Sequence, residues 1–199
     1  MPDTIANTTL SNRAVIRVGG EEARPFLQGL ITQEVIGLLP DQPRWSGLLT
    51  PQGKALFDFM LWADGTDVLI DCEAEQADAL IRRLSLYRLR RPVTIAREPG
   101  LAVHWASESF FTYRLILQIF EGVEELGQDQ TLWLEANAEE LNGVDFTKGC
   151  YIGQENTARM HYRSKVNRRL VAVPLAQADA KRQRLALPQL GLSIEHRRV

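Results

Sequence analysis

Cys150 is the residue of this chain whose neighbours best suit it for chemistry. Gly149 and Gly153 stand on either side, and glycine allows backbone conformations closed to other residues and close approach to a ligand. Lys148 lies two residues before the cysteine. A nearby cation stabilises the thiolate, which is both the nucleophilic and the metal-ligating form of cysteine. The spacing therefore predicts a reactive or ligating thiol at Cys150.

Further cations follow this cysteine along the chain. Arg159, His161 and Arg163 extend the positive charge, and Gln154 with Glu155 could begin a helix whose N-terminus adds to the same effect. The alternative interpretation is that Cys150 is a small buried apolar residue, as most free cysteines are. The two glycines and the density of cations favour the functional interpretation.

Cys72, the second of only two cysteines, has the opposite setting. It ends the apolar run VLIDC, and Asp71 and Glu73 flank it. Negative neighbours raise the pKa of a thiol, so we expect Cys72 to be an inert residue of the core or its edge. Two distant cysteines exclude a disulfide framework and a metal cage built from cysteine alone. The histidines at 104, 161 and 196 lack metal-ligand spacing, so no independent zinc site is expected.

The elements that must position Cys150 alternate between strands and helices. Period-two patterns and turn residues predict strands at residues 14–18, 44–50, 54–63, 67–72, 92–97, 101–105 and 168–173. Helical spacing of apolar residues predicts helices at 21–30, 73–87 and 136–141. Residues 142–154 form a glycine-rich ordered loop that carries the cysteine. Hairpin connections indicate an α+β fold with an antiparallel or mixed sheet.

A specific resemblance accompanies these patterns. The run KGCYIGQE, residues 148–155, resembles the K-G-C-[FY]-x-G-Q-E signature of the YgfZ family. Three further segments resemble other parts of that family: FLQGLITQEV from residue 26, LLTPQGKALFDF from residue 48, and LEANAEELNGVDFTKG from residue 134. Together they cover most of residues 14–170.

The resemblance implies a fold of the aminomethyltransferase folate-binding type. Ferredoxin-like α+β units would enclose a central folate pocket, followed by a C-terminal β-barrel. Only 25 residues follow Pro174, too few for a closed barrel. We therefore expect a folate-binding α+β domain at residues 1–166, with residues 167–199 as the remnant of a truncated or reduced barrel.

The resemblance also implies a function. The ligand would be tetrahydrofolate or another reduced folate, and the role would be assembly or repair of iron–sulfur clusters for client enzymes, including one that modifies tRNA. Cys150 corresponds to the family's signature cysteine. Clusters usually take four protein thiolates, so a single cysteine would act in a shared or transient bond with a cluster, a client protein or a cluster carrier.

Candidate folate-binding residues lie in the signature and in one other segment. Within and after the signature they are Lys148, Gly149, Tyr151, Gly153, Gln154, Glu155 and Arg159. Asp78 follows a strand and loop as a pterin-contacting aspartate does in aminomethyltransferases, and a carboxylate can accept two hydrogen bonds from a pterin. The alternative for Asp78 is a solvated helix residue.

Charge is distributed unevenly along the chain. Residues 148–199 hold eleven Lys and Arg against three Asp and Glu, whereas residues 1–147 hold twelve against twenty-two. Such a basic segment attracts anions, whether nucleic acid, a polyglutamyl tail or an acidic partner; the alternative is a solvated basic tail. The segment lacks aromatic residues interleaved for base stacking, so direct RNA binding is the weakest of these interpretations.

The remaining sequence features bear on the cellular location of the protein and on its class of function. The polar start MPDTIANTTL predicts no signal peptide, and no apolar run approaches the roughly 18 residues of a membrane helix, so the default expectation is cytoplasmic. Dinucleotide-binding and P-loop motifs are absent. A rival function is a tetrahydrofolate-dependent aminomethyltransferase or other one-carbon transferase. It needs an acid or base beside the folate, for which Asp78 is the candidate, so we do not expect a typical enzyme.

Overall fold

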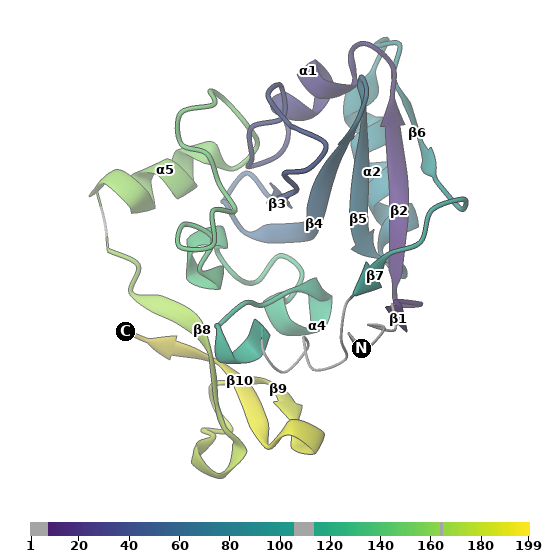
Figure 1. The fold of residues 1–199 in the computed structure, drawn as a ribbon. Coiled ribbons are helices and arrows are strands. Elements are labelled where there is room, and N and C mark those ends of the chain that lie inside the picture. The colour runs from purple at the N-terminus through teal and green to yellow at the C-terminus, as the bar shows by residue number, and fades with distance from the viewer. Residues whose placement is uncertain (1–7, 106–113, 164) are drawn as a thin grey trace.

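The computed structural model describes residues 8–105, 114–163 and 165–199. A five-stranded sheet stands beside a smaller three-stranded sheet, and short helices and loops lie between them (Figure 1). The strands are β1 (Thr8–Thr9), β2 (Arg13–Gly19), β3 (Arg44–Leu49), β4 (Ala55–Asp64), β5 (Asp67–Glu73), β6 (Thr94–Arg97), β7 (His104–Trp105), β8 (Arg168–Pro174), β9 (Gln183–Leu187) and β10 (Leu192–Arg198). The helices are α1 (Ala23–Gln28), α2 (Ala77–Arg88), α4 (Gly122–Leu126) and α5 (Gln154–Arg163), with 3-10 turns η1 (Trp133–Ala136), η2 (Leu175–Gln177) and η3 (Pro188–Leu190).

The five-stranded sheet has the order β3-β4-β5-β2-β6, and every neighbouring pair is antiparallel. The predicted hairpin between residues 44 and 63 is confirmed. Its turn depends on Gly53, which has a φ of +80° and donates its backbone N–H to the carbonyl of Thr50. The predicted α+β class with antiparallel pairing is therefore confirmed.

The two faces of this sheet differ because β4 alternates along its length. Phe57, Phe59 and Leu61 are buried in a first apolar core that α1 and α2 cover. Asp58 and Met60 point to the opposite face, toward the segment that follows residue 114. One face of the sheet thus makes the core, and the other is free to line a site.

A second apolar core joins the two sheets. Trp133 and Phe120, both fully buried, pack with Leu170 of β8 and Ile194 of β10. The last strands have the order β8-β10-β9 and form an open antiparallel sheet rather than a closed barrel. This sheet shares its core with the segment from Leu115 to Tyr151. The domain boundary after residue 166 stays a prediction.

Several predicted elements change in the structure. The predicted helix at 136–141 is wrong: the chain forms η1 and then turns, because Asn137 adopts a left-handed φ of +61° that ends the helix. The predicted strand at 101–105 contracts to β7. The predicted strand at 168–173 is confirmed as β8, whereas β9 and β10 were not predicted. The longest described helix, α2, has twelve residues, and none in the described ranges is suited to crossing a bilayer.

Candidate functional site

Lys148 anchors the loop that carries Cys150. Its ammonium group donates to the backbone carbonyls of Gln28, at 2.5 Å, and Ile31, at 2.6 Å. In return, the Gln28 amide donates to the carbonyl of Lys148 at 3.2 Å. Burial lowers the pKa of Lys148 to about 8. Among the described residues, the hydrogen bonds of this ammonium go to Gln28 at the end of α1 and to Ile31 just after it, and none goes to the sulfur of Cys150.

The start of the same loop is clamped by two residues that follow α1. The hydroxyl of Thr32 donates to the carbonyl of Gly143 at 2.7 Å, and the carbonyl of Thr32 accepts from the N–H of Asp145 at 3.0 Å. The Gln33 amide donates to the carbonyl of Asn142 at 2.7 Å. Both clamping side chains are buried, so they hold residues 142–145 against the connection between α1 and β3.

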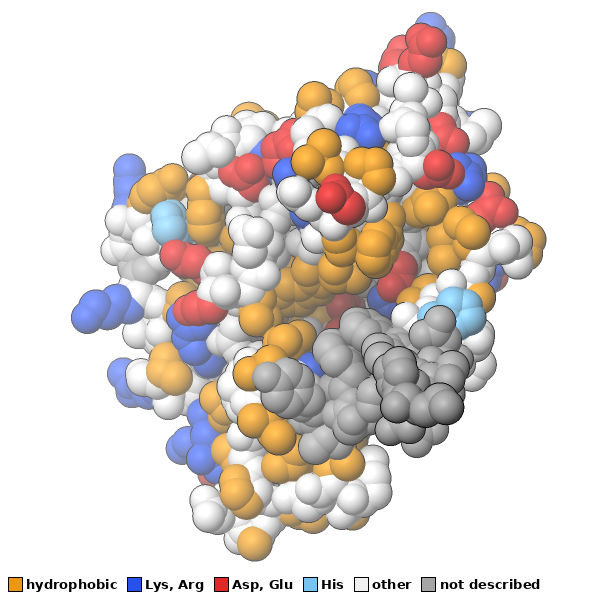
Figure 2. Space-filling view, viewed as in Figure 1, with side chains coloured by type: hydrophobic (Ala, Val, Ile, Leu, Met, Phe, Trp, Pro, Cys, Tyr) orange, Lys and Arg blue, Asp and Glu red, His pale blue; other side chains and the backbone are white. Residues whose placement is uncertain are grey.

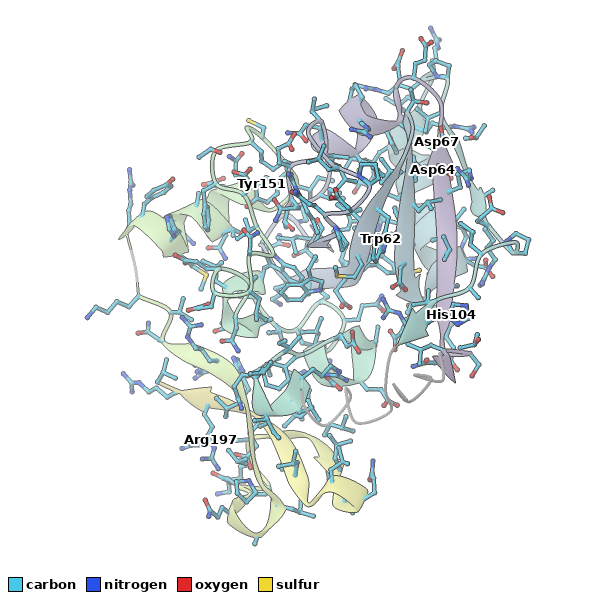
Figure 3. All side chains as sticks on the ribbon, in the orientation of Figure 1. Trp62, Asp64, Asp67, His104, Tyr151 and Arg197 are labelled. Carbon is cyan, nitrogen blue, oxygen red and sulfur yellow. The ribbon has the colours of Figure 1, made fainter. Side chains whose placement is uncertain are left out.

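A third anchor follows Cys150. Tyr151, labelled in Figure 3 in the loop before α5, is buried, and the Lys148 ammonium lies 5.0 Å from its ring centroid. Burial raises the pKa of Tyr151 to about 12. Gly153 adopts a φ of +85° and packs on the hairpin turn before β4; a Cβ there would lie 2.6 Å from the carbonyl oxygen of Thr50. Gly153 thus serves a close approach between two backbone segments.

Cys150 itself is exposed between these anchors. Gly149 beside it has a φ of +95° and open space where a Cβ would lie. The alternative that Cys150 is a buried apolar residue is therefore excluded, and its thiol faces solvent from a loop held on both sides. Cys72 is buried, as expected, and its pKa is raised to about 12. Burial is the main cause, and the charge of Asp71 adds less.

The rest of the predicted signature residues begin α5. Gln154 and Glu155 open the helix, which confirms the helix start proposed from sequence. Arg159 is exposed and donates to the side chain of Asn156 at 2.6 Å. His161 stacks on Phe146 with ring centroids 3.9 Å apart. Its Nδ1 lies 3.0 Å from Glu139, so α5 is held on the loop.

Asp78 lies apart from this loop. It is an exposed residue in the first turn of α2, and its carboxylate accepts a hydrogen bond from Arg97 at 2.7 Å. That bond lowers the pKa of Asp78. Since α2 packs on the core face of the five-stranded sheet, Asp78 is on the side opposite Asp58. The structure does not bring it together with the signature residues.

A cavity of about 230 Å³ lies on the free face of the five-stranded sheet. Figure 2 shows an orange-walled hollow near the centre of this face. Its lining residues are Arg13, Trp45, Asp58, Phe59, Met60, Arg114, Ile119, Glu121 and Leu141. Sequence reasoning missed this site, although charged residues on the alternate face of apolar strands, such as Asp58 in β4, were a signal for it.

Asp58 has an unusually high pKa within the cavity wall. The indole N–H of Trp45, at 3.4 Å, and the backbone N–H of Gly122, at 3.0 Å, both donate to its carboxyl group. Burial nevertheless raises the pKa of Asp58 to about 7, and the nearby charge of Glu121 acts in the same direction. The group can therefore accept or release a proton near neutral pH.

Two arginines lie near this carboxyl group, and each forms ion pairs with other carboxylates. Arg13 donates to Asp71 at 2.8 Å and lies 4.0 Å from Glu121. Arg114 makes a two-point contact with Glu125, at 2.7 and 2.8 Å, and its Nε lies 3.0 Å from Glu121. The cavity thus combines apolar lining residues with a network of ion pairs among its arginines and carboxylates. In residues 8–105, 114–163 and 165–199, no three metal-binding side chains gather into a site.

The sequence of this chain is similar to those of several named proteins. No family model matches the chain. The chain is 30% identical to "Iron-sulfur cluster assembly factor IBA57, mitochondrial" of Mus musculus, over 83% of this chain and 65% of the relative. The protein of the same name from Homo sapiens is also 30% identical, over 82% of this chain and 65% of the relative. The chain is therefore similar in sequence to proteins named as iron–sulfur cluster assembly factors. It spans about 65% of the length of these two relatives.

Two more comparisons concern location and fold. A homolog of the same assembly factor from Coccidioides immitis is 28% identical, over 89% of this chain and 59% of the relative. All three names describe mitochondrial proteins, so the cytoplasmic expectation is wrong. Among solved structures, aminomethyltransferase T of the glycine cleavage system from Bartonella henselae matches 45% of this chain and 25% of its own, with 22% identity and a TM-score of 0.43.

Proposed function

We propose that this chain binds a reduced folate and serves iron–sulfur cluster assembly or repair through the thiol of Cys150. The observation that carries the proposal is the exposed thiol on an anchored loop, in a chain 30% identical to named assembly factors. Because the chain spans only part of those relatives, their activity is proposed for it rather than transferred.

The chemistry of a single exposed thiol limits what Cys150 can do. Clusters usually take four protein thiolates, so Cys150 would contribute one bond to a cluster or persulfide that a client protein or cluster carrier also holds. Its exposure gives a partner direct access, and the anchors at Lys148 and Tyr151 keep the loop in place. By resemblance to the YgfZ family, a tRNA-modifying enzyme would be among the clients.

A cellular experiment tests the role of the thiol. In cells that lack their own assembly factor of this kind, the wild-type chain should restore iron–sulfur-dependent enzyme activity, and Cys150→Ala should not. Cys72→Ala is the matched control, since it removes a thiol that is buried. Restoration by Cys150→Ala at the wild-type level would refute the proposed role of the thiol.

The cavity beside Asp58 suits the ring system of a folate. Carboxyl oxygens of Asp58 and Glu121 could accept hydrogen bonds from pterin N–H groups, and Trp45 and Met60 supply apolar surface for a flat ring. Sites for whole drug-sized ligands measure about 300–1,000 Å³. A cavity of about 230 Å³ would therefore take the ring system, with the glutamyl part outside.

Calorimetry with tetrahydrofolate tests this part of the proposal separately. Wild-type protein should bind. Asp58→Asn should weaken binding about tenfold, because a neutral amide replaces the carboxylate that accepts a charge-assisted hydrogen bond from the pterin. Asp78→Asn is the matched control on the other side of the sheet and should bind as wild type does. Absence of binding at millimolar tetrahydrofolate would contradict folate binding and leave the test of Cys150 unaffected.

The rival function, a folate-dependent aminomethyltransferase or one-carbon transferase, gains one structural argument. Asp58, and not Asp78, is a carboxyl group that exchanges a proton near neutral pH inside a cavity. Incubation of the protein with tetrahydrofolate and an amine donor of one-carbon units decides between the two functions. Formation of methylenetetrahydrofolate that Asp58→Asn abolishes would establish the transferase; its absence from a folate-binding sample supports the accessory role.

A further inference from the structure

A second hollow, of about 810 Å³, lies between α4 and the inner face of the three-stranded sheet. We call it the basic groove. Its lining residues are Val123, Glu124, Gly127, Gln130, Arg168, Lys181, Arg182, Gln183, Arg184, His196 and Arg198. Five Lys and Arg side chains face one carboxylate, so the groove carries an excess of positive charge. It is lined by none of the residues of the cavity at Asp58.

Two arginines of the groove are cross-strand neighbours in the pairing of β8 with β10. Arg168 of β8 is directly opposite Arg198 of β10. Both belong to the strand face that also carries Leu170 and Ile194, which are fully buried, so this face continues from the second core into the groove. Like charges directly opposite one another in an antiparallel pair destabilise the sheet.

The next pair along the same strands provides an internal comparison. Arg169 is opposite Arg197, on the other face of the sheet, which we call the outer face. Arg169 lies 2.5 Å from Glu140, and Arg197, labelled on β10 in Figure 3, lies 2.8 Å from Glu195. The outer arginines are each neutralised within the chain. No ion pair to a carboxylate within the described residues involves Arg168 or Arg198, although the inner pair carries the same repulsion.

A β-bulge brings a third arginine to the groove. The pairing of β9 with β10 shifts between Ile194 and Glu195, which leaves Arg184 as the extra residue of β9. A bulge re-aims side chains, and here Arg184 reaches across to the side chains of Gln130 and Thr131. Burial lowers the pKa of Arg184. The fold therefore turns a further partly desolvated guanidinium group toward the same hollow.

The chemistry of the lining selects among anionic ligands. Four of the five cations are arginines, whose planar forks match carboxylate or phosphate oxygens. The lining holds one ring, that of His196, and no Phe, Tyr or Trp, whereas single-stranded nucleic acids stack successive bases on several aromatic side chains.

We propose that the basic groove binds an acidic segment of a partner protein, whose carboxylates pair with Arg168 and Arg198. The bound carboxylates would remove the repulsion between the two arginines, as Glu140 and Glu195 do on the outer face. The site is separate from Cys150 and from the cavity at Asp58, so it can hold a partner while the thiol is engaged.

Fluorescence anisotropy with a labelled oligoglutamate peptide tests the proposal on the full chain. Wild-type protein should bind the peptide at low ionic strength, bind the matching oligoglutamine peptide far more weakly, and lose affinity as salt rises. Arg168→Gln with Arg198→Gln should lower the affinity by at least about tenfold. The same double variant should have a melting temperature equal to or above that of wild type, because a like-charge pair is removed.

Matched variants distinguish binding in the basic groove from non-specific attraction to positive charge elsewhere on the protein. Arg82→Gln with Arg90→Gln removes two exposed arginines near α2 and should leave peptide affinity unchanged. Lys181→Gln, in the turn before β9, changes the groove without touching β8 or β10 and should weaken binding severalfold. Cys150→Ser should bind the peptide normally, so this test does not depend on the proposed cluster role.

Three outcomes would overturn the proposal. The first is equal peptide affinity of wild type and both groove variants, Arg168→Gln with Arg198→Gln and Lys181→Gln. The second is loss of affinity in the control pair at residues 82 and 90 as large as in the groove. The third is tighter binding of an RNA duplex than of oligoglutamate, lost in the groove variants, which would assign the groove to nucleic acid.

Discussion

Gly153 and Thr50 lie so close that a Cβ on the glycine would stand 2.6 Å from the carbonyl oxygen of Thr50. The loop of Cys150 therefore packs closely on the hairpin turn between β3 and β4. Lys148 and Tyr151 anchor the loop from other directions. The position of the exposed thiol therefore depends on backbone packing as well as on side-chain contacts.

Gly153→Ala should destabilise the protein more than Gly149→Ala. Both glycines have positive φ, which costs an L-residue about 1–2 kcal/mol, but only Gly153 also meets backbone atoms. We expect a loss of at least about 2 kcal/mol in the free energy of unfolding for Gly153→Ala. Urea denaturation of both variants measures the difference; equal losses would contradict the close approach.

Asp58 should make stability depend on pH in an unusual direction. Its pKa in the folded protein is about 7, against an ordinary value near 3.8, so between these values the folded state binds more protons than the unfolded state. The contribution of this group is fully present below about pH 4 and is lost as pH rises to about 7.

Comparison with Asp58→Asn isolates this effect. Relative to the variant, wild type should lose free energy of unfolding between pH 5 and pH 8, because the asparagine does not titrate. Thermal or urea unfolding at the two pH values measures it. A difference between the proteins that does not change with pH would mean that the carboxyl is not held in a buried environment.

The two cysteines should react very differently with an alkylating reagent. Cys150 is exposed and should be labelled in the folded protein, whereas Cys72 is buried with a pKa raised to about 12 and should be protected. Mass spectrometry of peptides after timed labelling distinguishes them. Denaturant should make both reactive. Comparable labelling of both cysteines in the native protein would contradict the burial of Cys72.

Ile194→Ala should destabilise the whole protein and not only its C-terminal sheet. Ile194 is fully buried with Trp133 and Phe120, so its truncation should cost about 2–4 kcal/mol through lost packing and a cavity. Val199→Ala at the exposed end of the chain is a control with little expected effect. Tryptophan fluorescence during unfolding should report one shifted transition; an unchanged main transition would show that the C-terminal sheet folds independently.

Local sequence patterns determined a large part of this fold. Alternation along residues 54–63 predicted a strand with two unlike faces, and Gly53 predicted the turn before it, because both depend on the backbone geometry of neighbouring residues. The glycines around Cys150 likewise indicated an ordered loop, and the positive φ of both glycines and the hydrogen bonds of Lys148 agree with that prediction. The burial of Cys72 also followed from its place in an apolar strand.

Only the tertiary structure decided which distant residues meet. Lys148 was expected near the thiol, but its hydrogen bonds go to carbonyls about 120 positions earlier, which no local pattern encodes. Asp78 looked suitable from its local sequence, whereas Asp58 lines the cavity because the sheet turns its face toward residues 114–141. The opposition of Arg168 and Arg198 depends on the register of strands far apart in the sequence, and that register follows from burial of Leu170 and Ile194 in a shared core.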